Sequence, residues 1–147
     1  MNAHVINVPF DVPTWTEHLN TTDPLALVIR GHLYVEAALV QRIEAAITNT
    51  EGLDTATLPF PLKVKFAVAL GMLDPADVGA LTALNRLRVK FAHDLRTQLN
   101  DQDEADLHNA LSPQHRALVD GMRRPEMPFI GRLRCDIVGL ILRLHQS

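Results

Sequence analysis

The sequence predicts a single all-α domain, a helical bundle of four to five main helices spanning residues 1–147. The chain has 147 residues, of which 47% are hydrophobic and 21% charged, a length and a mix that suit one hydrophobic core. Apolar residues recur at steps of three and four over several long segments, which is the period of an amphipathic helix. Strand signals are scarce, because alternation with a period of two is nowhere sustained and only residues 5–8 resemble a short extended piece.

Three of the expected helices begin with the same kind of pair, a side chain that can cap the helix followed by Pro. The cap oxygen accepts a hydrogen bond from a free backbone N–H. Pro loses nothing at the first helical position, because its missing donor would be unpaired there. The three pairs are Asp23-Pro24, Asp74-Pro75 and Ser112-Pro113.

The expected helices follow one another along the chain as long antiparallel neighbours. Residues 1–22 form an N-terminal extension, and the polar residues 49–57 form a loop. Gly71 is a natural left-handed cap at the end of a short helix. The acidic stretch 101–106 interrupts the next helix, and 123–128 is a Pro-bounded linker. The predicted helices cover residues 24–47, 61–71, 75–99, 113–122 and 129–145.

Composition excludes some classes of function. The formal net charge of −3 does not favour a protein that coats nucleic acid along its whole surface, although a local basic site needs only a few cations. The single Cys135 excludes an internal disulfide and a cysteine-based zinc site, and its apolar surroundings in the sequence predict a buried, inert thiol. We see no signal-peptide pattern, and the most apolar segment carries four charged residues. We therefore expect a cytoplasmic protein that does not enter a membrane.

The segment that is most informative about chemistry is LNRLRVKFAHDL, at residues 84–95. It contains Arg88 and His93. Histidine titrates near neutral pH and can therefore take up or give a proton, whereas arginine keeps its charge and offers a planar fork to phosphate oxygens. These are the groups that metal-free RNA cleavage needs: a base for the 2′-OH, an acid for the leaving oxygen and a cation for the charge on phosphorus.

This segment resembles the Arg–(four to six residues)–His motif of the HEPN superfamily. More narrowly, it is similar to the subgroup that includes the mannitol operon repressor, in which a helix reads approximately Leu-Asn-x-Leu-Arg-Asn-Lys-x-Ala-His. RGHLYVE at residues 30–36 resembles the first-helix pattern of that subgroup, and FPLKVKF at 60–66 resembles its middle Phe-x-x-Lys segment. The resemblance covers about half of the chain, and residues 101–147 have no counterpart in it.

The resemblance implies a helical bundle and, for many members, a metal-independent RNase that acts as a homodimer and uses no cofactor. Arg88 and His93 would be the catalytic residues. RNA and an antitoxin or regulatory protein are the partners that it implies. Other members have no nuclease activity and act as regulators or binding modules. The residues expected to take part in binding are Asn85, Arg86, Lys90, Glu36 and His32.

The spacing of the catalytic pair bears on the number of subunits. Five residues along an α-helix turn about 500° and rise about 7.5 Å, which leaves Arg88 and His93 about 140° apart. The two side chains therefore do not share one stripe of the helix. Either Arg88 bends its long side chain around the helix, or a partner subunit completes the site. This spacing and the precedent of the resembled family, in which two copies of the Arg–His helix meet near a two-fold axis, predict a homodimer through the helix at 75–99.

One departure from the family pattern bears on catalysis. Val89 directly follows Arg88, where the family usually has a polar residue, often Asn. A polar group there would orient the arginine or the phosphate, so its loss weakens the case for cleavage more than the case for phosphate binding. Alternatively, Arg88 pairs with a carboxylate such as Glu36, and His93 is a surface histidine.

The remaining candidates also have structural alternatives. Asn85 can serve only as a hydrogen-bonding group between helices. His32 and Glu36 lie four residues apart on one helix face, but two ligands are too few for a tight metal site, so we expect no metal there. Basic residues of the middle segments form either a phosphate-binding rim or a solvated face; they are Lys63, Lys65, Arg86 and Lys90.

Three functions therefore stay open. The first is a HEPN-type RNase of the toxin or defence kind, and the second is a catalytically silent regulator that resembles the mannitol operon repressor. The third is a helical protein-interaction module without a role in nucleic-acid binding. Arg88 and His93 favour the first two, whereas Val89 and the mild acidity of the chain favour the last two.

Overall fold

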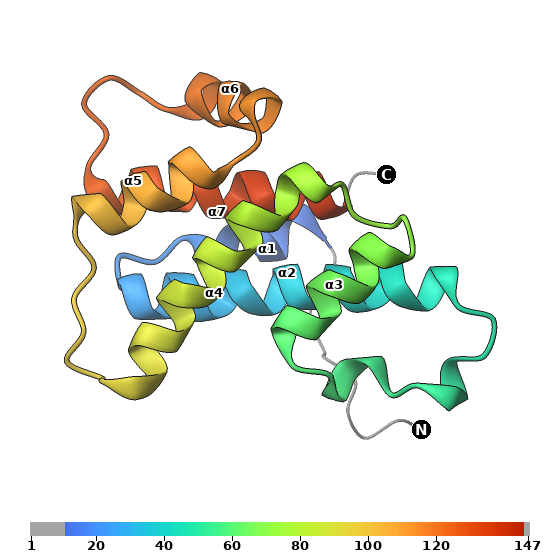
Figure 1. Cartoon of the computed structure of the whole chain (residues 1–147). Coiled ribbons are helices and arrows are strands. Elements are labelled where there is room, and N and C mark those ends of the chain that lie inside the picture. The colour runs from blue at the N-terminus through green and yellow to red at the C-terminus, as the bar shows by residue number, and fades with distance from the viewer. Residues whose placement is uncertain (1–10, 146–147) are drawn as a thin grey trace.

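The computed structural model describes residues 11–145 and is all-helical, with no strand among them (Figure 1). This confirms the predicted all-α bundle. The described chain contains seven α-helices: α1 Val12–Leu19, α2 Pro24–Ala46, α3 Phe60–Ala69, α4 Val78–His93, α5 Asp101–Ala110, α6 Pro113–Met122 and α7 Phe129–His145. Short 3-10 helices lie at Thr50–Gly52, Thr55–Thr57 and Pro75–Asp77. The predicted extended piece at residues 5–8 falls outside the described residues.

Helix α2 lies at the centre of the bundle and contacts α1, α3, α4 and α7. Helix α4 crosses α2 obliquely and in the opposite sense, since Asn85 faces His32 while the end of α4 lies beside Leu25. Helix α7 runs parallel to α2: Gly31 faces Ile137, and Arg42 donates a hydrogen bond to the Leu144 carbonyl at 2.9 Å. A Cβ on Gly31 would lie 2.4 Å from Cγ2 of Ile137, so the absent side chain permits this close packing.

The hydrophobic core explains why α2 is apolar around most of its circumference. Its buried residues face four neighbouring helices rather than one, which is the pattern of a helix enclosed by a bundle. They are Leu27, Val28, Gly31, His32, Tyr34, Val35, Ala37, Ala38, Leu39, Val40 and Ile43. Within residues 11–145, no helix is both long and apolar enough to cross a bilayer.

The predicted capping pairs are confirmed. Asp23 accepts a hydrogen bond from the backbone N–H of Leu25 at 3.0 Å, and Asp74 accepts one from Ala76 at 2.9 Å. Ser112 caps α6 in the same way. Gly71, with a φ of 72°, ends the α3 segment in the left-handed region, as predicted.

The predicted helix at 75–99 is wrong at its C-terminal end, because α4 stops at His93. The carboxylate of Asp94 accepts a hydrogen bond from the backbone N–H of Arg96 at 2.9 Å, a local turn that competes with the helical bonds. The acidic stretch 101–106, predicted to be an interruption, instead begins α5. Asn100 and Asp103 form a reciprocal capping box there, and acidic residues stabilise a helix N-terminus.

Two further expectations need correction. The predicted N-terminal extension contains α1, whose Trp15 is buried against Tyr34 and His145, with ring centroids 5.8 and 4.9 Å away. Cys135 is only partly buried, and its Sγ lies 3.7 Å from the sulfur of Met127. Burial raises the pKa of the Cys135 thiol, which is consistent with the expected low reactivity.

Candidate functional site

The structure brings together three of the residues predicted to form the site, which we call the His32 cluster: His32, Asn85 and Arg88. Asn85 Oδ1 lies 3.0 Å from His32 Nε2 and accepts a hydrogen bond from Arg88 Nε at 3.3 Å. His32 comes from α2 and the other two from α4. The Phe60 ring of α3 covers the imidazole, with a centroid distance of 4.4 Å. The His32 cluster therefore joins α2 and α4, and Phe60 packs α3 against it.

The environment of His32 keeps the imidazole neutral. Burial lowers the pKa of His32 from 6.5 to about 4, and the positive charge of Arg88 adds to this effect. Because Asn85 Oδ1 is an acceptor, the proton of the neutral ring resides on Nε2. A neutral, buried His32 is a poor proton donor at neutral pH, so the structure favours a positioning role over acid–base chemistry for this residue.

Glu36, one turn after His32, makes an ion pair with Lys63 rather than with Arg88. Lys63 Nζ lies 3.5 Å from Glu36 Oε1 and donates a hydrogen bond to the Ala56 carbonyl at 2.9 Å. The lysine is buried, whereas Glu36 is partly exposed. The alternative in which Arg88 pairs with Glu36 is therefore wrong within the described chain. A buried Lys63 is also unsuited to the phosphate-binding rim.

The remaining predicted residues lie on the outer face of α4. Arg86, Lys90 and His93 are exposed, and their spacing of four and three residues places them on one stripe of the helix. Lys90 Nζ pairs with Asp103 of α5 at 2.5 Å. His93 is the last residue of α4. Arg88 bonds back toward Asn85, so a single chain does not bring the predicted catalytic pair together.

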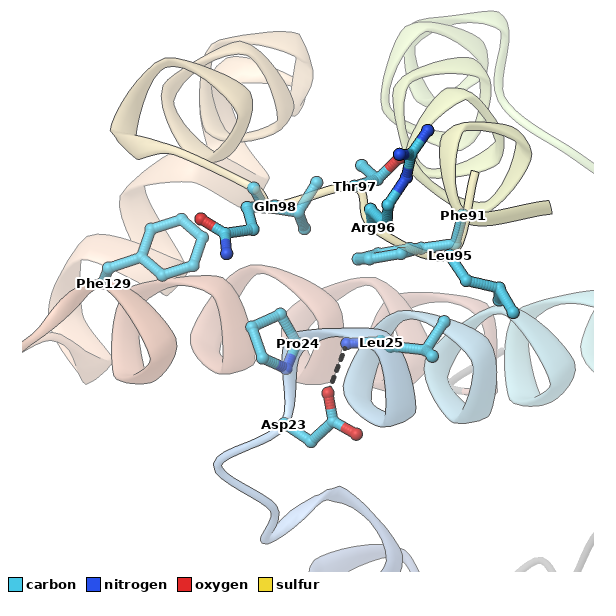
Figure 2. A pocket seen from close by; sticks show the side chains of 10 residues that line it. Asp23, Pro24, Leu25, Phe91, Leu95, Arg96, Thr97, Gln98 and Phe129 are labelled. Carbon is cyan, nitrogen blue, oxygen red and sulfur yellow. Dashed lines mark hydrogen bonds between the residues drawn. The ribbon is translucent and has the colours of Figure 1, made fainter. Parts of the chain in front are cut away.

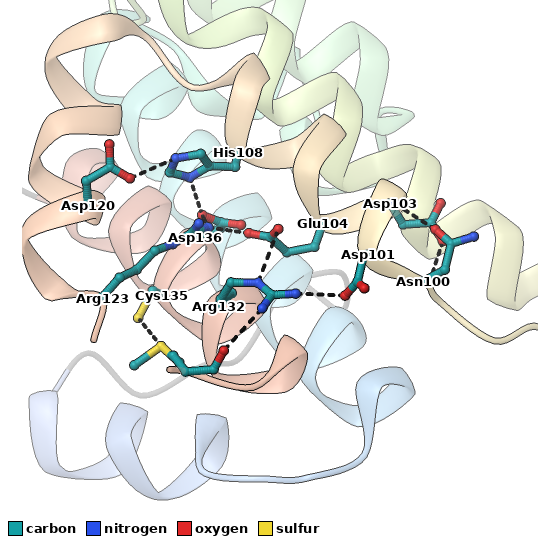
Figure 3. A network of polar contacts seen from close by, with 11 residues as sticks. Asn100, Asp101, Asp103, Glu104, His108, Asp120, Arg123, Arg132, Cys135 and Asp136 are labelled. Carbon is teal, nitrogen blue, oxygen red and sulfur yellow. Dashed lines mark hydrogen bonds and ion pairs between the residues drawn. The ribbon is translucent and has the colours of Figure 1, made fainter. Parts of the chain in front are cut away.

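A second polar cluster, which sequence reasoning missed, joins α5, α6 and α7. We call it the Asp136 network: Glu104, His108, Arg123 and Asp136 (Figure 3). Arg123 Nη2 donates to Glu104 Oε1 and to Asp136 Oδ1, the latter at 2.7 Å. His108 Nδ1 lies 2.9 Å from Asp136 Oδ1. Glu104 and His108, four residues apart on α5, were the available sequence signal.

Burial changes the titration of the Asp136 network. Asp136 has no exposed surface, and desolvation together with the neighbouring carboxylate of Glu104 raises its pKa to about 8, against the opposing effect of Arg123. Burial and the charge of Arg123 lower the pKa of His108. Asp120 holds the other ring nitrogen, Nε2, at 2.9 Å. Asp136 thus has the carboxylate of Glu104 beside it, whereas the charges beside His32 are the positive ones of Arg88 and Lys63.

A pocket of about 670 Å³ opens where α4 ends, next to the N-terminus of α2 (Figure 2). Its walls are mainly apolar, and Arg96 and Gln98 come from the segment between α4 and α5. None of the residues predicted for the site lines it. The apolar side chains that face it are Leu25, Phe91, Leu95, Leu99 and Phe129.

Comparison of the chain with family models, with curated proteins and with solved structures found no match.

Proposed function

We propose that this chain is a HEPN-like regulator that binds nucleic acid as a homodimer and does not cleave RNA. The observation that carries the proposal is the position of Arg88. The Nε of Arg88 donates a hydrogen bond to Asn85 of the His32 cluster, which lies one turn earlier on α4. His93 lies five residues further on, at the exposed end of the same helix.

This arrangement argues against cleavage by one subunit. A general base acts only within hydrogen-bond reach of the proton that it removes, about 3 Å, and the cation must contact the same phosphate. The imidazole that shares a partner with Arg88 is His32, which burial keeps neutral. Val89, half-buried on α4, supplies no polar group that would orient a phosphate between Arg88 and His93.

The same face of α4 supports a binding role. Arg86, Lys90 and His93 form an exposed stripe, and such stripes bind the phosphate backbone with little dependence on base sequence. Asp103 offsets part of the charge of Lys90. We therefore expect weak, salt-dependent binding by one subunit, which a homodimer would strengthen by presenting two stripes.

A second candidate is a dimeric, metal-independent RNase of the toxin or defence type. One observation favours it: His93 is exposed, and within residues 11–145 its side chain makes no hydrogen bond or ion pair, so the imidazole is free to approach a partner subunit. In a dimer, the two His93 side chains could meet near the axis and act together with a partner's arginine.

Nuclease activity is the first test. Wild type, His93→Ala and Val89→Asn are incubated with a mixed RNA substrate in the presence of EDTA. We expect no cleavage by any of them while light scattering shows a homodimer at tens of micromolar. The opposite result is cleavage by wild type that a 2′-deoxy substitution at the scissile position blocks and that His93→Ala reduces by roughly 10²-fold or more. That result would overturn the proposal of a regulator and establish the RNase.

Nucleic-acid binding is the second test. Fluorescence anisotropy with labelled RNA and DNA compares wild type with Arg86→Ala and with Arg96→Ala, a matched control whose arginine is exposed outside α4. We expect Arg86→Ala to weaken binding and to lower the salt dependence by about one ion. Equal binding by both variants, or none by wild type, would favour the interaction module or a protein partner.

A further inference from the structure

The Asp136 network has the donor set of a metal site. Carboxylate oxygens of Glu104 and Asp136 and a ring nitrogen of His108 all lie within 4.8 Å of one another. Two of these residues share one face of α5, and the third comes from α7, so both helices fix the geometry. We propose that these three residues form a binding site for a divalent transition metal ion, which the guanidinium of Arg123 occupies while the metal is absent.

The orientation of His108 fits this assignment. One ring nitrogen faces Asp136 at 2.9 Å, and the other lies 2.9 Å from Asp120 Oδ1. Histidines that bind a metal use one nitrogen for the ion and donate the other N–H to a carboxylate, which fixes the tautomer and the ring. Asp120 holds the outer nitrogen in this way. Nδ1 is then left to face the centre of the site.

Asp136 provides an independent observation. Its side chain has no exposed surface, and its Oδ2 is buried without a hydrogen-bond partner within the described chain. A buried acceptor without a partner has lost its hydrogen bonds to water and gained none in the protein, which is unfavourable. A metal ion would give Oδ2 a partner, whereas the present contacts of Arg123 and His108 use only Oδ1.

Arg123 marks the position where a cation is stable. Its Nη2 contacts both Glu104 and Asp136, as a metal ion between them would. Arg123 follows directly after α6, at the start of the segment that leads to α7, and its side chain is 18% exposed. The guanidinium can therefore leave for solvent when a divalent ion enters. Arg132, which contacts the other oxygen of Glu104 at 3.7 Å, can stay.

Two carboxylates and one imidazole define the class of ion. Mixed oxygen and nitrogen ligands suit zinc, manganese and iron in the divalent state. Metal–ligand bonds of about 2.1 Å require ligand atoms about 3.4 Å apart in a tetrahedral site, so the side chains must close slightly around the ion. The fourth position would be open to water. Binding would displace the guanidinium of Arg123 from between the two carboxylates.

The experiment titrates Zn²⁺, Mn²⁺ and Co²⁺ into the wild-type chain by calorimetry, with the visible absorption of Co²⁺ as a report on coordination. The variants are Asp136→Asn, Glu104→Gln and Arg123→Gln, with Arg124→Gln as the matched control. Arg124 is the exposed neighbour of Arg123, so its loss changes the net charge equally. Circular dichroism establishes that each variant is folded, and Arg123→Lys replaces Arg123→Gln if the latter is not.

We expect one ion per chain, bound at least tenfold more tightly by Arg123→Gln than by wild type and unchanged in Arg124→Gln. Binding should fall at least 100-fold in Asp136→Asn and in Glu104→Gln. The same ion should raise the melting temperature of Arg123→Gln more than that of wild type. Binding that survives in Asp136→Asn, or the absence of binding in both wild type and Arg123→Gln, would reduce the network to ion pairs and overturn the proposal. Neither result depends on RNA binding or cleavage.

Discussion

The His32 cluster and the Asp136 network both bury a titratable side chain, but the charges of the neighbouring residues are opposite in sign. Each buries titratable groups between three helices, and desolvation penalises the charged form of each. In the first, the neighbours are cations, and the pKa of His32 falls to about 4. In the second, the neighbours include carboxylates, and the pKa of Asp136 rises to about 8. Both groups therefore become neutral near pH 7, one by losing a proton and the other by keeping one.

The difference lies in what each cluster leaves unsatisfied. The His32 cluster closes on a single amide oxygen, which accepts from both partners. The Asp136 network depends on one guanidinium between two carboxylates, and it leaves a buried oxygen without a partner within the described chain. A cluster that rests on one cation should be more sensitive to the loss of that cation.

The largest expected effect comes from removing this cation. Arg123→Gln should lower the free energy of unfolding by about 3 kcal/mol, the scale for leaving a buried partner charge uncompensated. Chemical denaturation in EDTA measures it, with Arg124→Gln as the control, which should change stability by less than about 0.5 kcal/mol. Equal stability of the two variants would mean that Arg123 does not hold the network together.

The next effect is a dependence of stability on pH with opposite signs in the two clusters. Between pH 4 and 6.5 the unfolded chain binds a proton at His32 that the folded chain does not. The free energy of unfolding should therefore decrease as pH falls through this range, by about 3 kcal/mol in total from this residue. Asp136 keeps its proton only in the folded chain, so its contribution is lost as pH rises from about 4 towards 8.

Variants separate these two contributions. The stability of wild type minus that of His32→Gln should rise with pH between 4 and 6.5. The stability of wild type minus that of Asp136→Asn should fall with pH up to about 8. Urea denaturation at several pH values measures both differences. If both differences in stability changed with pH in the same direction, the opposite signs expected for the two clusters would be wrong.

A smaller change should make the first cluster resemble the second. Asn85→Asp places a carboxylate between His32 and Arg88, and an opposite charge within hydrogen-bond distance favours the protonated imidazole. We expect the pKa of His32 to rise by at least about one unit, equivalent to about 1.4 kcal/mol. Titration of the imidazole by NMR measures it, and an unchanged pKa would show that burial alone sets this value.

The smallest expected effect is that of Arg88→Ala. It removes one hydrogen bond of 3.3 Å from a half-buried side chain, which should cost about 1 kcal/mol. Loss of Arg88 should therefore impair function more than folding. Thermal denaturation measures the loss of stability in Arg88→Ala, with Arg86→Ala as a control at an exposed position of the same helix. A loss of several kcal/mol would instead identify Arg88 as a structural residue.

Local signals explain how much of the fold was predictable. Each cap followed by Pro marked a true helix start, because capping depends on neighbouring residues alone. The helix at 75–99 was predicted too long because its apolar stripe continues through Leu95 and Leu99, beyond the turn at Asp94. Helix α5 was missed because its acidic residues suggested a loop, although Asn100 caps it.

The site was less predictable than the fold, for a physical reason. His32, Asn85 and Arg88 were selected on pattern, and the structure brings them together through packing of α2 on α4. The Asp136 network needs a residue from α7 that lies 28 positions after His108. No periodicity within one helix reveals such a contact. Besides the spacing of Glu104 and His108, the position of Asp136 in an apolar run was a second signal, because a buried carboxylate requires a partner.

The parallel packing of α2 against α7 bears on how the nascent chain folds. Gly31 and Ile137 touch although roughly 100 residues separate them, and a ribosome needs roughly 5 to 20 s to synthesise that length. Throughout this interval one apolar face of α2 has no cover. Packing of α2 can be completed only once α7 has emerged from the ribosome, so we expect a chaperone that binds apolar segments to contact α2 during this interval.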